Sequence, residues 1–247
     1  MATWLNGKVI KKIQWNERLF SLRIEVEFGD FLPGQFVRVA LDIDDERVAR
    51  PYSLVSSPSD DYIEIYFNIV PEGPLTPELA MLDEGDEIFV SDRVSGFLTI
   101  EEIPECRYLW MLATGTGVGP FLSILKNQAA WQRFEKVVLG YSVRDSSELA
   151  YRESIEAIQA VHADQLVFTP FVTREKVTDA MQSRIPVCIE DGSFEARTGI
   201  MISEHDSHVM MCGNSAMISD VSVVLEKRGL RKHRRREPGH LTTEKYH

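Results

Sequence analysis

Apolar and polar residues alternate in short runs through the first hundred residues, and this period of two predicts β-strands. The runs cover residues 8–13, 19–26, 35–41, 62–69 and 87–90. Turn-forming residues separate them, among them Pro33-Gly34, Asp44-Asp45 and Pro71-Glu72-Gly73-Pro74. Five or six strands at roughly ten-residue spacing predict an antiparallel barrel or sandwich, with one short helix over 76–82.

The pattern changes after residue 104. Continuous apolar runs over 108–113, 136–141, 166–172 and 207–212 alternate with helically spaced segments over 120–131, 148–162 and 215–229, and 185–190 is a helix or a turn. Strands that alternate with helices predict parallel βαβ units. We therefore predict two domains, an antiparallel β-barrel over 1–101 and an α/β domain with a parallel sheet over 102–247.

Composition and charge exclude several classes of protein. The 247 residues are 44% hydrophobic and 26% charged, which is typical of globular chains. No apolar run is long enough to span a bilayer, and no signal-like segment opens the chain. Three isolated cysteines cannot hold an iron–sulfur cluster, and no metal site is expected. The net charge of −11 argues against nucleic-acid binding, and free thiols indicate a cytoplasmic location.

A glycine-rich turn, Thr114-Gly115-Thr116-Gly117-Val118-Gly119-Pro120, follows the first apolar strand of the second domain. Backbone N–H groups at the start of the following helix attract phosphate, and glycines let a pyrophosphate approach. Pro120 stands where the third glycine of a strict dinucleotide fingerprint would fall, so the turn is a related form, and a purely structural turn remains an alternative.

Arginine replaces the acidic residue that an NAD site usually places after the second strand. Arg144 follows Gly140-Tyr-Ser-Val143, Arg174 follows Thr173 after the third strand, and Arg184 lies ten residues further on. Guanidinium groups bind phosphate oxygens in pairs of hydrogen bonds, so the set favours NADP over NAD. Each arginine alone could equally be a solvated surface charge.

The motifs together resemble the bacterial ferredoxin/flavodoxin–NADP reductases, in particular the short enterobacterial type. The resemblance runs along the whole chain, from Trp4-x-x-Gly7-Lys8 through Arg50-x-Tyr52-Ser53, the glycine-rich turn and Cys212-Gly213-Asn214 to Pro238-Gly239-His240. It implies an N-terminal flavin-binding Greek-key barrel followed by a C-terminal nucleotide-binding domain, which agrees with the two halves predicted from the patterns.

The resemblance also implies roles for individual residues. Arg50 would bind the FAD pyrophosphate, Tyr52 would stack on the flavin ring, and Ser53 would bond near its N5 atom. The further FAD contacts implied are Pro51, Tyr66, Phe67, Asn68, Pro74, Leu75, Thr76, Thr116, Tyr246 and His247. The NADP contacts expected are Gly115, Gly117, Val143, Arg144, Thr173, Arg174, Arg184, Cys212, Gly213, Asn214 and Asp220.

Ser53, Cys212 and Glu244 are the residues that the resemblance places at the reacting atoms. Cysteine at position 212 would lie near the nicotinamide, although most free cysteines are simply small buried hydrophobic residues. The family's terminal Tyr-Trp is Tyr246-His247 here, so the tail that would cover the flavin ends in a smaller ring.

The implied activity is hydride transfer from NADPH to FAD, followed by one-electron transfer to flavodoxin or ferredoxin, by a monomeric enzyme. Such carriers are acidic, and Arg231, Lys232, Arg234, Arg235 and Arg236 form a candidate docking face. Two alternatives remain at this point: an NAD(P)H:free-flavin reductase, and a non-catalytic flavin-binding electron-transfer subunit.

Overall fold

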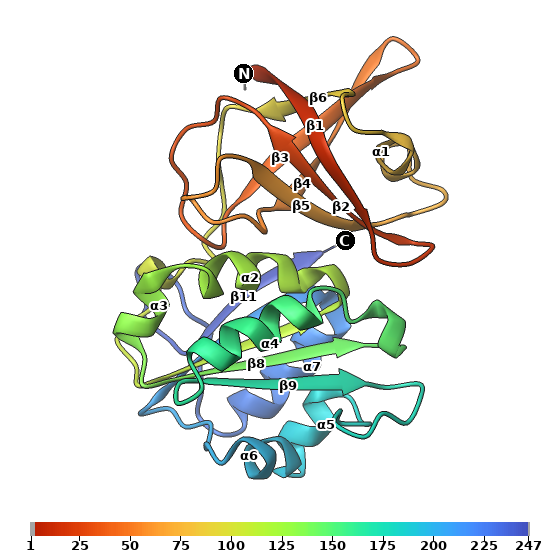
Figure 1. Ribbon diagram of the computed structural model, residues 1–247. Helices are drawn as coiled ribbons and strands as arrows, with labels where there is room; N and C mark the ends of the chain where they lie inside the picture. Colours follow the sequence, from red (N-terminus) through yellow and green to blue (C-terminus); the bar gives the residue numbers. More distant parts are fainter. Residues whose placement is uncertain (1–2, 247) are drawn as a thin grey trace. The chain divides into compact units, whose positions relative to one another are not determined.

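The computed structural model describes residues 3–246, and these residues form two compact units (Figure 1). The first unit contains the chain up to Thr99 together with Gly119–Lys126. The second contains Ile100–Val118 and the chain from Asn127 onward.

The first unit is built on a six-stranded antiparallel sheet. Its strands are β1 (Trp4–Gln14), β2 (Leu19–Glu25), β3 (Phe36–Ile43), β4 (Glu46–Ser53), β5 (Ile63–Asn68) and β6 (Glu87–Ser91), in the order β4-β3-β6-β1-β2-β5. One helix, α1 (Thr76–Met81), lies between β5 and β6 in sequence. The prediction of an antiparallel β domain with a single short helix is confirmed.

The two edge strands of this sheet meet, which curls the sheet into a barrel. Leu54 bridges Ile65, and the N–H of Val55 donates to the carbonyl of Glu64 at 2.8 Å. The apolar side chains of the alternating runs point inward, where they form a core with Leu79 of α1. Closure of this kind removes exposed strand edges.

Strand β4 is missing from the strands predicted by alternation. Its sequence, Glu46-Arg-Val-Ala-Arg-Pro-Tyr-Ser53, is mostly polar and contains Pro51, so the two-residue period is broken. Proline is tolerated there because β4 lies at one end of the sheet order. A tight turn whose residues Asp44 and Asp45 have φ of 50° and 64° brings β4 back against β3.

The second unit contains a five-stranded parallel sheet in the order β11-β10-β7-β8-β9. The strands are β7 (Tyr108–Thr114), β8 (Lys136–Val143), β9 (Leu166–Val172), β10 (Ser207–Asn214) and β11 (Leu241–Tyr246). Its helices are α3 (Gln128–Arg133), α4 (Arg152–Val161), α5 (Ile185–Glu190), α6 (Ser193–Thr198) and α7 (Ser215–Glu226), with short 3₁₀ turns η1 (Ile100–Glu102), η2 (Gly115–Val118) and η3 (Ser146–Glu148). Figure 1 shows helices on both faces of this sheet.

The structure differs from the sequence prediction at two places in this half of the chain. The single helix expected over 120–131 is two helices, α2 (Gly119–Leu125) and α3, because Asn127 starts a new helix by accepting a hydrogen bond from the N–H of Ala129. Strand β11 was not predicted. It is only six residues long and largely polar, and its pairing with β10 is invisible to local periodicity.

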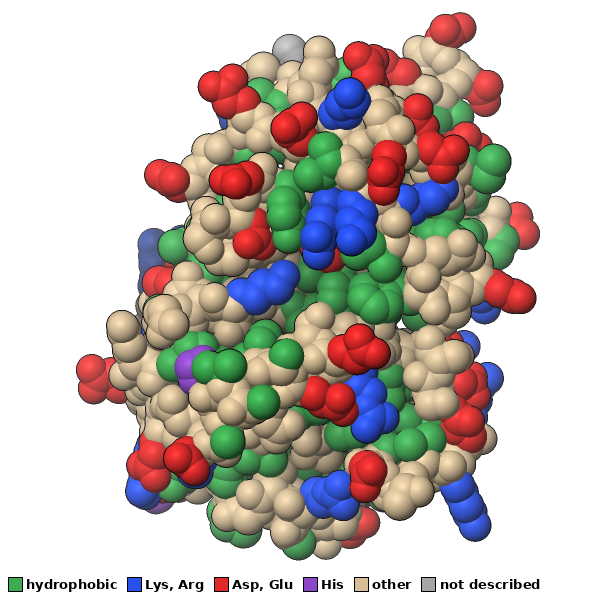
Figure 2. Space-filling view, viewed as in Figure 1, with side chains coloured by type: hydrophobic (Ala, Val, Ile, Leu, Met, Phe, Trp, Pro, Cys, Tyr) green, Lys and Arg blue, Asp and Glu red, His purple; other side chains and the backbone are tan. Residues whose placement is uncertain are grey.

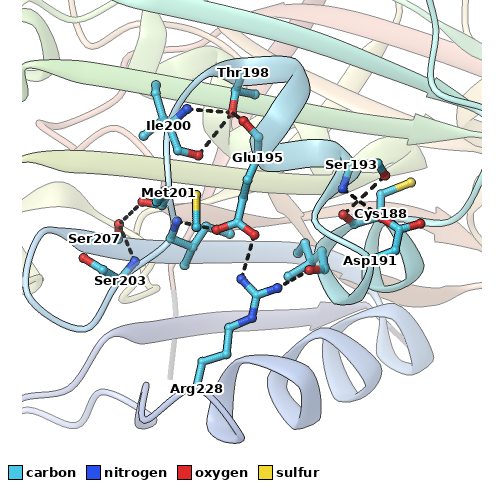
Figure 3. A network of polar contacts seen from close by, with 12 residues as sticks. Cys188, Asp191, Ser193, Glu195, Thr198, Ile200, Met201, Ser203, Ser207 and Arg228 are labelled. Atoms are coloured by element: carbon cyan, nitrogen blue, oxygen red, sulfur yellow. Dashed lines mark hydrogen bonds and ion pairs between the residues drawn. The ribbon is translucent and has the colours of Figure 1, made fainter.

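A buried ion pair ties α6 to the segment after α7 (Figure 3). Glu195 is 4% exposed and accepts hydrogen bonds from Arg228 Nη1 at 2.7 Å and from the N–H of Ile202 at 2.7 Å. Arg228 also donates to the carbonyl of Ile189 in α5. Phe194, next to Glu195, packs edge-on against Trp110 of β7 with ring centroids 5.2 Å apart.

No helix among residues 3–246 is long and apolar enough to cross a membrane.

Acidic side chains are spread over the visible face of the protein (Figure 2). Residues 1–100 carry 18 acidic and 9 basic side chains, whereas 226–247 carry 3 acidic and 8 basic ones. The excess positive charge is therefore local to the last part of the chain.

Candidate active site

A pocket of about 390 Å³ lies where the parallel strands of the second unit end. Thr114 ends β7, Ser142 and Val143 end β8, Thr173 follows β9, and Asn214 ends β10. In sheets of this kind ligands bind beyond the carboxyl ends of the strands. The pocket is therefore where a nucleotide is expected from topology alone.

All three arginines singled out from the sequence line this one pocket: Arg144, Arg174 and Arg184. Each is exposed; Arg144 lies in the loop after β8, and Arg174 and Arg184 lie near the two ends of the loop between β9 and α5. Arg144 follows β8, Arg174 follows β9, and Arg184 directly precedes α5, whose first turn contains Pro186. Arg144 precedes Arg174 by thirty residues and Arg184 by forty, yet the three cations share one concave surface, which suits a phosphate group.

Hydrogen bonds hold the two loops that carry Arg144 and Arg174 side by side. The N–H of Arg174 donates to the carbonyl of Arg144 at 2.9 Å, and both the N–H and the hydroxyl of Thr173 donate to the carbonyl of Val143 at 3.2 Å. Glu148 accepts from the N–H of Arg144 at 2.9 Å. The positions of the two guanidinium-bearing segments are therefore coupled.

The glycine-rich turn forms η2 and packs tightly against the end of β10. A Cβ atom at position 117 would lie 2.4 Å from the carbonyl oxygen of Cys212, so only glycine fits there. Gly115 lines the pocket, whereas Gly117 is buried beside β10. The sequence prediction of two nucleotide-contacting glycines therefore combines one pocket residue and one packing residue.

Asn214 has a structural task in addition to its place in the pocket. Its side-chain oxygen accepts from the N–H groups of Ala216 and Met217 and caps α7, and its own N–H donates to the hydroxyl of Thr114 at 2.7 Å. These bonds fix the turn between β10 and α7. Asp220, on the exposed side of α7, also lines the pocket.

Cys212 lies in the middle of the sheet and is fully buried. Burial raises the pKa of its thiol well above the usual value, and the nearby carboxylate of Glu244 raises it further. Glu244 is its register partner on β11, and Tyr246 is the partner of Asn214. Cys212, Gly213 and Glu244 do not line the pocket. The thiol stays protonated at neutral pH, and so it is not a nucleophile in this state.

The residues expected to hold the flavin lie on two neighbouring strands of the first unit. Arg50, Pro51, Tyr52 and Ser53 end β4. Arg50 is exposed, and among the described residues its guanidinium donates only to the carbonyl of Ala49, at 2.8 Å. Tyr52 is partly buried, and burial raises the pKa of its phenol, so its hydroxyl stays protonated and can donate a hydrogen bond.

Strand β5 places an aromatic ring, that of Phe67, against Tyr52. The rings of Tyr52 and Phe67 meet edge-to-face with centroids 6.1 Å apart. Tyr66 and Phe67 are buried and Asn68 is exposed at the strand end. Beyond β5, the hydroxyl of Thr76 accepts from the N–H of Val70 at 2.8 Å, which anchors the loop that carries Pro74 and Leu75. The side chain of Leu75 belongs to the barrel core.

The remaining flavin candidates fall elsewhere. Thr116 lies in η2 and Tyr246 in β11, both in the second unit. His247 lies outside the described residues.

Several pocket residues were missed by sequence reasoning: Thr114, Ser142, Glu148, Ile185, Pro186, Ala216 and Met217. Thr114 and Ser142 carried a usable signal, because each ends an apolar strand beside a residue that was predicted. Glu148 had none, since its pocket position depends on how the loop after β8 folds.

Comparison with known proteins agrees with this arrangement. Residues 7–93 match the oxidoreductase FAD-binding domain family, and residues 111–223 match the oxidoreductase NAD-binding domain family. The chain is 41% identical over 247 residues to a flavodoxin/ferredoxin–NADP reductase of Escherichia coli (strain K12), with all of both chains covered. It is 33% identical over 255 residues to a ferredoxin–NADP reductase of Pseudomonas aeruginosa, covering 99% of this chain and 98% of the relative.

A solved structure gives the same result. The crystal structure of a ferredoxin NADP+ reductase from Neisseria gonorrhoeae with bound FAD and NADP superimposes with a TM-score of 0.94 at 30% identity, covering 99% of each chain. The two domain matches define the protein as a flavin- and nicotinamide-type oxidoreductase. More narrowly, the chain belongs to the flavodoxin/ferredoxin–NADP reductase family. The predictions of family, fold class and enzyme class are confirmed.

Proposed function

We propose that this protein is an FAD-dependent reductase that moves electrons between NADPH and a flavodoxin or ferredoxin. Membership of the family bears out the activity and the pair of cofactors. The single observation that carries the choice of NADPH is the convergence of Arg144, Arg174 and Arg184 on one pocket. Bound FAD would supply the conversion of a two-electron hydride donor into a source of single electrons.

The residues of the barrel fit a flavin nucleotide. Arg50 presents an exposed guanidinium with donors left for a pyrophosphate, and Tyr52 offers a half-buried ring next to it in sequence. Ser53 follows directly and would place a hydroxyl at the edge of the ring that Tyr52 covers. We assign FAD binding to the domain 1–101 and NADP binding to 102–247.

The pocket of the second unit fits the 2′-phosphate end of NADPH. Three guanidinium groups supply bidentate donors for the phosphate, and they are exposed, so a ligand can reach them. Gly115 and the capped start of α7 at Asn214 offer space and backbone dipole for the pyrophosphate. In this proposal Cys212 packs behind the turn as a neutral thiol, and Glu244 is its acidic neighbour.

Replacement of each pocket arginine by alanine tests the nucleotide assignment. A hydrogen bond to a charged group contributes about 1.5–3 kcal/mol, so each variant should bind NADPH roughly tenfold or more weakly. NADH lacks the phosphate, and its affinity should change little. The measurement is an anaerobic spectral titration of flavin reduction in R144A, R174A and R184A.

Arg152→Ala is the matched control, because Arg152 is paired with Glu156 on α4 and does not line the pocket. Equal losses for NADPH and NADH in the three pocket variants would contradict the assignment of a 2′-phosphate site. Retention of FAD through gel filtration separates this function from that of a free-flavin reductase.

Two of the five basic residues proposed as a docking face for the carrier form ion pairs with acidic neighbours. Arg235 makes two hydrogen bonds to Glu102, at 2.8 and 2.5 Å, and Arg234 pairs with Glu237 at 3.5 Å. Those two charges are partly neutralised. Arg231, Lys232 and Arg236 are exposed and make no side-chain ion pair among residues 3–246, and we propose them as the main docking cations for an acidic carrier.

Charge reversal tests this docking face. Lys232→Glu combined with Arg236→Glu should slow carrier reduction while sparing the reduction of ferricyanide, which needs no protein docking. Arg152→Glu carries the same kind of reversal away from the face and serves as the control. Equal loss with both acceptors would contradict the assignment.

Cytoplasmic location and a monomeric state complete the proposal. The three cysteines, Cys106, Cys188 and Cys212, are free thiols, which suits a reducing compartment. Cell fractionation and light scattering of the holoenzyme test these two points.

A further inference from the structure

Two carboxylates outside the arginine set hold the loop that follows β8. Glu148 accepts from the N–H of Arg144 at 2.9 Å, within the same loop. Glu175 comes from the neighbouring loop after β9 and accepts from the N–H of Ser146. Glu175 is therefore the only one of the two that links the Arg144 loop to the Arg174 loop through a side chain.

The position of Glu175 in the chain explains how its hydrogen bond to Ser146 affects the two arginine loops. It directly follows Arg174, whose N–H donates to the carbonyl of Arg144 at 2.9 Å. The backbone bond and the carboxylate bond are adjacent, so they clamp the two loops at two successive points. The segment that follows returns to the sheet at Met181, which exchanges backbone bonds with Pro170 and Val172, and so leads directly to Arg184.

We propose that Glu175 is a positioning residue for the arginine pocket, holding Arg144 and Arg174 in the arrangement that binds the 2′-phosphate and thereby contributing to selectivity for NADPH. The proposal rests on the nucleotide site proposed above and names a residue that does not itself line the pocket. A guanidinium pair held in place loses less conformational freedom when the phosphate binds.

A purely electrostatic role of Glu175 and a positioning role predict opposite changes in phosphate binding when its carboxylate is removed. Glu175 is an anion next to a site for an anion, so a purely electrostatic role means that its removal improves phosphate binding. A positioning role means that removal weakens binding, because the loops spend less time in the competent arrangement and the apparent affinity falls by that fraction.

The experiment compares Glu175→Ala and Glu175→Gln in the full-length FAD-loaded protein. Calorimetry measures the affinity for 2′,5′-ADP, which carries the phosphate, and for 5′-AMP, which does not. We expect E175A to bind 2′,5′-ADP about fivefold to tenfold more weakly, with the affinity for 5′-AMP unchanged. E175Q keeps an oxygen acceptor and should stay within about twofold of the wild type.

Two further variants isolate the bond itself. Ser146→Pro removes the N–H donor, together with the serine hydroxyl that also bonds to Glu175, without changing charge, at a position that begins η3, where proline is tolerated. It should weaken 2′,5′-ADP binding as E175A does, and the double variant should lose little more than either single one. Glu153→Ala, an exposed carboxylate on α4, is the charge-matched control and should have no effect.

The outcomes are distinct. Tighter binding of 2′,5′-ADP by both E175A and E175Q would overturn the proposal in favour of electrostatics. Unchanged binding, or equal loss for 2′,5′-ADP and 5′-AMP, would also overturn it and leave Glu175 as a local cap of η3. If the wild type itself binds 2′,5′-ADP no better than 5′-AMP, the nucleotide assignment fails instead.

Discussion

Removal of the Glu195 carboxylate should destabilise the second unit more than removal of any surface carboxylate. In Glu195→Ala the buried N–H of Ile202 loses its acceptor, which costs about 1–3 kcal/mol. Arg228 loses its partner as well, but its side chain is 29% exposed and it keeps the carbonyl of Ile189. Breaking a buried pair costs about 3–5 kcal/mol, so we expect a value near the lower end, about 3 kcal/mol.

Trp110 is a suitable local probe for this measurement. A two-domain chain can unfold in steps, so a signal from the whole molecule would mix the two units. The indole of Trp110 is fully buried and lies against Phe194, the neighbour of Glu195. With Trp4, Trp15 and Trp131 replaced by phenylalanine, its fluorescence reports on this core alone.

Urea unfolding in that background should show a midpoint lower by about 1–3 M in E195A, given a slope of about 1–3 kcal/mol per molar urea. Glu190→Ala is the matched control, because Glu190 pairs with Lys227 at 3.7 Å and both side chains are about two-thirds exposed. Exposed pairs contribute less than about 1 kcal/mol, so its midpoint should barely move. A shift in E195A no larger than that in E190A would refute the reasoning from burial.

Two further perturbations follow from the geometry. Gly117→Ala should abolish tight NADPH binding, because its Cβ would lie 2.4 Å from the backbone oxygen of Cys212. Gly115→Ala, whose Cβ meets nothing within 4 Å, should cost only about 1–2 kcal/mol of stability for its left-handed backbone. Titration with NADPH and thermal melts of both variants check this. Burial lowers the pKa of His208 to about 3 from 6.5, so the unfolded state binds the extra proton first and stability should fall as the pH drops below 6.5 toward 3. The free energy of unfolding should fall by at most about 1.4 kcal/mol per pH unit. Between pH 6.5 and 5 its dependence on pH should flatten in His208→Gln but persist in His205→Gln, which changes an exposed ring. An unchanged pH dependence in H208Q would assign the effect to other groups.

Local pattern predicted most of the fold because most of its elements follow a simple period. An alternating run of the barrel buries one face of its strand, and an apolar strand of the parallel sheet buries both faces, so the sequence pattern follows the burial. The two missed strands, β4 and β11, are largely polar, so neither shows an apolar period. Such a strand is specified by its pairing partner, β3 for β4 and β10 for β11, which no local window contains.

The residues of the candidate site likewise divide into those that the local sequence pattern predicts and those that it does not. Arg144 and Arg174 were predictable because each lies within two residues of the end of an apolar strand, and the carboxyl ends of parallel strands meet at one edge. Glu148 and Glu175 were not, because each acts on a backbone N–H whose position depends on loop conformation. Strand ends are fixed by topology, whereas contacts between loops require the folded coordinates.

The charge distribution makes a last prediction about how an acidic carrier meets this acidic enzyme. The whole chain has a net charge of −11, while residues 226–247 carry 8 basic and 3 acidic side chains. At about 0.01 M salt the screening length is about 30 Å, so an acidic carrier should be repelled by the whole molecule as well as attracted by the proposed docking face around Lys232 and Arg236. Near 0.15 M the length is about 8 Å, and only the local attraction is felt.

The rate of carrier reduction should therefore pass through a maximum as salt rises, and decline when even the local attraction is screened at about 1 M. Stopped-flow measurement across this range checks it, with ferricyanide as the second acceptor. In the variant with Lys232→Glu and Arg236→Glu the maximum should disappear and the rate should rise steadily with salt, because only repulsion is left to screen. A wild-type rate that falls steadily from the lowest salt would mean that the local face outweighs the net charge at every distance.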